Sequence, residues 1–63
     1  MIEEIRDKKI KMNDKCVWTN TIGEEKTGVF KGIEGPSKRQ AGFLPDGEEK
    51  IIYVDVAQLM KKV

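Results

Sequence analysis

One cysteine and no histidine leave this chain of 63 residues without the crosslinks that often hold very small domains together. Cys16 has no second thiol to pair with inside the chain, and the usual zinc sites need several Cys or His ligands. A domain of this size buries only about 60% of the surface that its unfolded chain exposes. We therefore expect one domain, with no disulfide, metal or cofactor, whose stability comes from packing or from association.

Charged residues are numerous but balanced, with 12 Lys+Arg against 11 Asp+Glu. A net charge of +1 points to neither nucleic acid nor a membrane surface as the partner. The N-terminus has acidic residues where a secretory signal would have basic and apolar ones, and the apolar runs are far shorter than the roughly 20 residues of a membrane span. Together with the single cysteine, these features predict a cytoplasmic chain that does not enter a membrane.

Short runs of β-preferring residues alternate with turn-forming residues from position 13 onward. Four strands are predicted, over residues 15–20, 26–33, 40–45 and 50–54. The glycines of the second strand predict a bulge or a sharp bend. Asp46-Gly47 is the strongest hairpin signal and predicts a positive φ at Gly47. Asp55 stands where it would cap one helical turn over residues 55–60.

Three segments carry a family resemblance: TGVFKGI at residues 27–33, GFL at 42–44 leading through Asp46-Gly47 into IYV at 52–54, and VAQL at 56–59. They resemble an SH3-like small barrel of the Tudor and KOW kind. In that superfamily such segments are successive strands, with a short helical turn before the last one, and the fold usually binds proteins or nucleic acids. The resemblance implies a mainly β fold over residues 13–63, a single small barrel of four to five short antiparallel strands with a short C-terminal helical turn.

The N-terminal segment, residues 1–12, has no clear period. Its apolar residues fall loosely at helical spacing, but Lys9 interrupts the stripe. We expect a frayed helix or a tail. The alternation of Ile10 and Met12 leaves the entrance to a strand as the alternative.

The strand pattern also predicts which side chains are buried. We expect the core to consist of Val17, Val29, Leu44, Ile52, Val54 and Leu59. Cys16 lacks any histidine to activate it, so we expect a buried and inert thiol.

The candidate binding surface consists of Trp18, Phe30, Lys31, Lys38 and Arg39. Tryptophan is favoured at binding hot spots, although Trp18 has capping of the core as its alternative role. The glycines beside Phe30 either open a groove around that ring or merely allow a bend. The basic residues either gather into a patch with Lys61 and Lys62 or are solvated charges among the neighbouring acids.

No candidate pair of base and nucleophile is present, and the paired carboxylates lie in a tail or in turns where water keeps both ionised. We therefore expect a binding domain without enzymatic activity and without an evident small-molecule substrate. Its expected role is that of an adaptor or modulator that docks on another protein or on a copy of itself. The alternative is a nucleic-acid-binding accessory domain of the KOW or Tudor type, which requires the scattered lysines to lie on one face.

Overall fold

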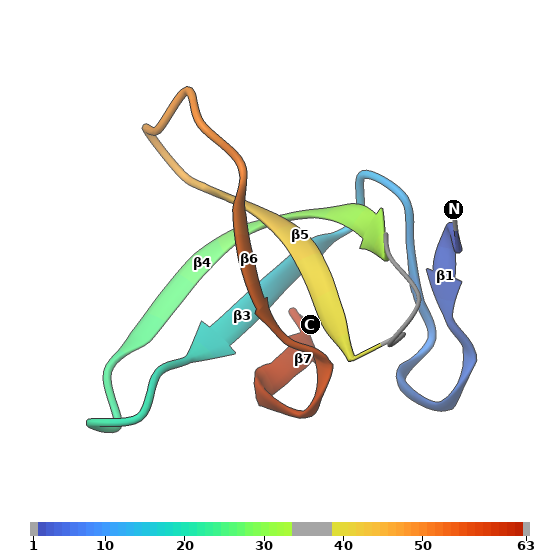
Figure 1. Ribbon diagram of the computed structural model, residues 1–63, viewed down its shortest axis with the longest axis horizontal. Helices are drawn as coiled ribbons and strands as arrows, with labels where there is room; N and C mark the ends of the chain where they lie inside the picture. Colours follow the sequence, from blue (N-terminus) through green and yellow to red (C-terminus); the bar gives the residue numbers. More distant parts are fainter. Residues whose placement is uncertain (1, 34–38, 63) are drawn as a thin grey trace.

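The structure, a computed structural model, describes residues 2–33 and 39–62 of the chain (Figure 1). It is mainly β. The strands of these residues are β1 (Glu4–Ile5), β2 (Ile10–Lys11), β3 (Lys15–Thr19), β4 (Glu25–Ile33), β5 (Gln40–Pro45), β6 (Ile52–Asp55) and β7 (Leu59–Lys61). Two 3-10 turns, η1 (Arg6–Lys8) and η2 (Val56–Gln58), precede β2 and β7. None of the helices in the described parts of the chain is long and apolar enough to cross a membrane.

Five strands form one antiparallel sheet in the order β6-β5-β4-β3-β7. Figure 1 shows the long β4 arching across the molecule between β3 and β5. Strands β1 and β2 form a separate pair, which a bridge between Ile2 and Ile33 joins to the end of β4. The expected mainly β fold is confirmed. The expected barrel is not closed within residues 2–33 and 39–62, because β6 and β7 are not hydrogen-bonded neighbours, and the helical turn is a single 3-10 turn.

The strand boundaries follow the local signals closely. Strand β5 matches the predicted segment at both ends, and β6 begins at Ile52 rather than at residue 50. The delay arises because the Asp46-Gly47 turn, closed by Glu48 N–H donating to the Pro45 carbonyl at 3.1 Å, is followed by further bends before pairing resumes. Gly47 has a φ of 82°, as predicted. The carboxylate of Asp55 accepts from the Ala57 N–H at 2.9 Å and caps η2, also as predicted.

The predicted irregularity in the second strand is confirmed. The β4–β5 register shifts between Phe30 and Ile33, and Gly32 within this stretch has a φ of 96°. A bulge inserts a residue into one strand and changes which face the following side chains occupy. As a result, Phe30 and Ile33 both reach the core, although an unbroken strand would place them on opposite faces.

The core lies on one face of the curled sheet, which we call the inner face. It consists of Ile5, Ile10, Cys16, Phe30, Ile33, Ala41, Phe43, Val54 and Leu59. The predictions for Val54, Leu59 and Cys16 are confirmed. The predictions for Val17, Val29 and Leu44 are wrong because these side chains are half-buried on the opposite, outer face; Ile52 is 37% exposed. These strands carry apolar residues at both odd and even positions. The sequence pattern therefore does not reveal which face of the sheet is buried.

The N-terminal segment is neither a frayed helix nor a tail. Strands β1 and β2 pair around η1, with Ile5 opposite Ile10, and Lys9 takes a left-handed conformation at the turn. Both isoleucines belong to the same core cluster as the main sheet. The strand alternative was the correct one for Ile10. Helical spacing misleads here because the two side chains are buried by residues far away in the sequence.

A lysine ties this N-terminal pair to the other end of the chain. The ammonium of Lys8 in η1 donates to the carbonyl of Val56 at 2.8 Å and to that of Leu59 at 2.6 Å. These carbonyls lie at the start and just beyond the end of η2, and the Val56 carbonyl also accepts the Leu59 N–H that closes this turn. Lys8 therefore holds the turn that leads into β7.

Candidate functional site

A groove of about 370 Å³ opens at one end of the inner face. It is lined by Trp18, Lys26, Pro45, Glu48, Lys50 and Ile52. These residues come from the far ends of β3 to β6 and from the β5–β6 connection. The β3–β4 register places Trp18 directly opposite Lys26, and residues opposite each other share one face of a sheet. The groove is thus the part of the inner face that the core side chains leave uncovered.

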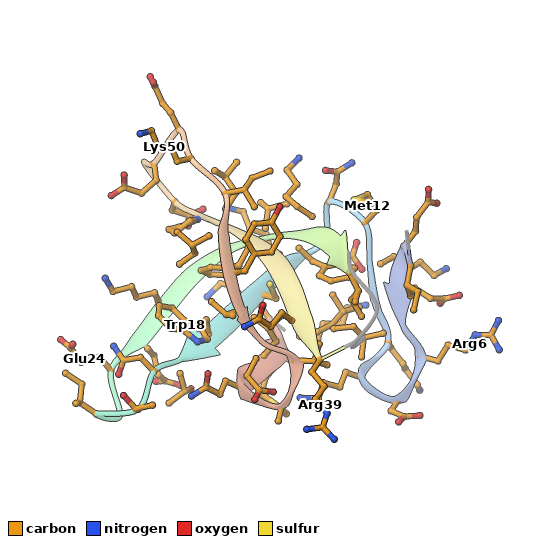
Figure 2. All side chains as sticks on the ribbon, in the orientation of Figure 1. Arg6, Met12, Trp18, Glu24, Arg39 and Lys50 are labelled. Atoms are coloured by element: carbon orange, nitrogen blue, oxygen red, sulfur yellow. The ribbon has the colours of Figure 1, made fainter. Side chains whose placement is uncertain are left out.

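Trp18 forms the aromatic wall of this groove and is held in place from two sides. Its ring packs on Phe43, with centroids 6.0 Å apart and planes inclined by 55°. Its indole N–H donates to the side-chain oxygen of Gln58 at 3.3 Å. The residue is half-buried, so it caps the core and also presents part of its surface to the groove. Figure 2 labels its side chain on the ribbon. The core-capping alternative is confirmed for Trp18, and its role in binding stays a prediction.

The charges that line the groove are two cations and one anion. Lys26, Lys50 and Glu48 are all exposed. Within residues 2–33 and 39–62, none of the three side chains makes an ion pair or a hydrogen bond. Figure 2 shows Lys50 at the tip of the β5–β6 hairpin, clear of the sheet. The groove therefore combines apolar walls with a net positive rim.

Phe30 is not presented at the surface. Its side chain is 0% exposed and lies opposite Phe43 in the sheet, so the flanking glycines do not present it to a partner. Gly28 instead allows close packing: a Cβ there would come within 2.6 Å of the Phe43 ring. The bend was the correct alternative for these glycines, and the expectation of an exposed Phe30 is corrected.

The two basic candidates that the structure describes, Lys31 and Arg39, do not line the groove beside Trp18. Lys31 lies beside Gly42 on the outer face, and its ammonium donates to the Asn13 side chain at 2.7 Å. Arg39 is exposed next to the start of β5, at the opposite end of that strand from the Lys50 hairpin (Figure 2). Lys38 lies outside the described residues. Of the four candidates among the described residues, the structure places only Trp18 at the groove.

The sequence interpretation missed the other five groove residues, which are Lys26, Pro45, Glu48, Lys50 and Ile52. A signal was present for Lys26, because a hairpin that folds between residues 15–20 and 26–33 brings it near Trp18. Ile52 was assigned to the core because it lies in an apolar run. Its position at the open end of the sheet, which leaves it 37% exposed, depends on the curl of the sheet.

Outside the groove, the two chemical features to consider in the described residues are a reactive thiol and a metal site. Burial raises the pKa of the Cys16 thiol to about 11, with a smaller contribution from the nearby Asp14 carboxylate, so the thiol is protonated at neutral pH. No group of three or more His, Cys, Asp or Glu residues in the described ranges is arranged to hold a metal ion. Cys16 is therefore a packing residue.

A wider surface hollow of about 620 Å³ lies over the N-terminal strand pair. It is lined by Ile2, Glu3, Glu4, Arg6, Lys11 and Met12. Arg6 already pairs with Glu4 at 3.7 Å, and no aromatic ring lines this hollow. The groove beside Trp18 is the better candidate site, because aromatic side chains dominate binding hot spots.

Protein-family models, curated proteins and solved structures were compared with the chain, and none of them matches it. The functional interpretation therefore depends on the groove.

Proposed function

We propose that this chain is a small, non-enzymatic binding module of the SH3-like barrel type, which acts as an adaptor or modulator by docking a segment of a protein partner in the groove beside Trp18. The strand order supports the barrel assignment. Strands β3 to β6 are successive neighbours, and η2 directly precedes β7, which returns to pair with β3. This is the arrangement that the sequence resemblance implies, although a fold alone does not specify a partner.

The observation that carries the proposal is the half-buried Trp18 at the open end of the inner face. Its ring is already fixed by Phe43 and Gln58, so little further side-chain freedom is lost when a ligand packs against it. Pro45 and Ile52 provide apolar walls beside the ring. A rigid aromatic surface with apolar neighbours and a few polar groups is typical of peptide and ligand sites.

Nucleic-acid binding is the second candidate function. It is favoured by the two lysines that flank an aromatic ring, a combination on which unpaired bases stack while cations contact the phosphates. Glu48 in the same lining and the apolar Pro45 and Ile52 favour a protein segment instead. Oligonucleotide binding that falls steeply with salt would support the nucleic-acid function.

The proposal is tested by selecting peptides from a displayed random library on the folded chain and mapping their contacts by amide chemical shifts in NMR. We expect the largest shifts at Trp18, Lys26 and Ile52 and at the Trp18 indole N–H. The variant Ile52→Glu should lose binding while keeping its fold, because this side chain is partly exposed at the groove. Ile22→Glu is the matched control, since Ile22 is 77% exposed in the β3–β4 turn. Selected peptides that bind Ile52→Glu as tightly as the wild type would disprove the groove as the site.

A further inference from the structure

We infer that the groove beside Trp18 selects acidic segments, extended peptides in which carboxylates flank an apolar side chain. This inference rests on the proposed function and specifies the class of its ligand. The apolar side chain would pack between Trp18 and Ile52, and the carboxylates would pair with Lys26 and Lys50.

The charges of the groove carry the inference. Four other lysines of the chain already have a partner: Lys8 on backbone carbonyls, Lys31 on Asn13, Lys15 on Asp46 and Lys61 on Asp14. In the described parts of the chain, Lys26 and Lys50 have no such partner, and neither do Lys9, Lys11 and Lys62. Lys26 and Lys50 differ from those three because they line the concave, partly apolar surface beside Trp18, where a charge pair is less exposed to water than on a convex one. An acidic ligand supplies the complementary charge.

Glu48 restricts the kind of anion that fits. It lines the same groove as the two lysines, so a ligand must keep its negative charges away from this carboxylate. A peptide carries negative charge only on its acidic residues, so neutral side chains between its carboxylates can lie beside Glu48. A nucleic-acid strand carries a charge on every phosphate, and some of these would face Glu48.

The test uses a synthetic peptide in which glutamate and leucine alternate, a matched peptide with glutamine in place of glutamate, and single-stranded oligothymidylate. Trp18 is the only tryptophan of the chain, and neither peptide contains an aromatic residue, so its emission reports occupancy of the groove. We expect the glutamate peptide to bind on the order of tenfold more tightly than the glutamine peptide at low salt, with the difference shrinking as salt is raised.

Variants identify the groups responsible. The double variant Lys26→Glu, Lys50→Glu should abolish the preference for the glutamate peptide, and the milder pair Lys26→Gln, Lys50→Gln should reduce it. Lys62→Glu is the control, because Lys62 is exposed and does not line the groove. Glu48→Gln should tighten binding of the glutamate peptide a few-fold. Circular dichroism checks that each variant keeps its β structure.

The outcomes separate this inference from the proposed function. Equal affinity for the two peptides, with binding that Ile52→Glu abolishes, would overturn the acidic selectivity and leave the groove as a protein-binding site. A preference for the glutamate peptide that survives Lys26→Glu, Lys50→Glu would also overturn it. Oligothymidylate that quenches Trp18 while neither peptide binds would overturn both, in favour of the nucleic-acid function.

Discussion

At the residue scale, Gly28 shows how one missing side chain permits the core to form. Its backbone is not in the left-handed region, so conformational freedom is not the reason for glycine here. A Cβ at this position would lie 2.6 Å from Cζ of Phe43 and would also collide with the Leu44 carbonyl. The Phe43 ring therefore occupies the space where other residues have their first side-chain atom.

We predict that Gly28→Ala destabilises the chain by about 1–3 kcal/mol, the usual cost of an added group in a packed core. Gly42→Ala is the control, because its Cβ would meet Lys31 Cβ at 3.2 Å, a contact that a small shift relieves. Urea unfolding followed by Trp18 emission measures both variants. Equal losses at the two positions would contradict the role given to the Phe43 ring.

The thiol of Cys16 provides a second prediction at this scale. Burial raises its pKa to about 11, and the thiolate is the reactive form, so iodoacetamide at pH 8 should modify the native chain far more slowly than the chain unfolded in guanidinium. An unperturbed thiol has a pKa of 9.0, so the unfolded state releases this proton first as the pH rises. The contribution of Cys16 to stability should then decline as the pH rises from about 9 towards 11. Equal alkylation rates in the two states, followed by mass spectrometry, would show that the thiol is accessible.

At the scale of elements, the contact of Lys8 with η2 links two turns that lie far apart in the sequence. We predict that Lys8→Met costs about 1–2 kcal/mol, because two carbonyls lose a charged hydrogen-bond donor. Arg6→Met should cost little, since the Arg6 side chain is 88% exposed and its ion pair with Glu4 is solvated. Thermal unfolding by circular dichroism compares the two. A larger loss for Arg6→Met would mean that η1 acts through its surface charges.

Elements with local signals could be predicted from the sequence, and those that depend on distant partners could not. Strand β5, the bend at Gly32 and the positive φ of Gly47 follow from short patterns of glycine, proline and β-branched residues. The face of the sheet was assigned wrongly for Val17 and Val29, because apolar side chains occur on both faces of β3 and β4. Shifting the assignment of a strand by one residue exchanges its buried and exposed faces.

The residues of the candidate site also divide into those with a local sequence signal and those that depend on distant neighbours. Trp18 could be selected by residue type alone, since tryptophan is uncommon in proteins but enriched in binding hot spots. Lys26 and Lys50 did not, because a lysine becomes a site residue only through its neighbours, and these follow from register and from the curl of the sheet. Phe30 was misjudged because glycines beside an aromatic ring fit both an exposed groove and a tight core.

At the scale of the whole molecule, the two ends of the chain complete one core. The Cα radius of gyration is 10.4 Å, and the extents along the three principal axes are 26, 23 and 22 Å. Ile2 exchanges two backbone hydrogen bonds with Ile33, at 2.9 and 2.8 Å, and Asn13 N–H donates to the Phe30 carbonyl at 2.8 Å. Residues 2–13 are thus bonded to the end of β4, and Figure 1 shows β1 beside that end of the sheet.

We predict that a chain starting at Asn13 does not fold alone, although the barrel resemblance begins there. The truncation removes Ile5 and Ile10 from the core, and loss of a buried isoleucine typically costs about 2–5 kcal/mol. It also removes Lys8 from η2. Total stabilities of small domains start at about 5 kcal/mol, so the combined loss is enough to unfold the chain.

Circular dichroism and Trp18 emission of the truncated chain test this prediction. Two substitutions in the full chain measure how much the Ile10 side chain contributes to stability. Ile10→Ala should lower the midpoint of thermal unfolding strongly, and Ile10→Val, which removes a single methyl group, should lower it by a fraction of that amount. A truncated chain that unfolds cooperatively near the wild-type temperature would mean that residues 13–63 are an independent domain. In that case β1 and β2 would be an accessory hairpin, and the burial of Ile10 would contribute to its docking rather than to the folding of the sheet.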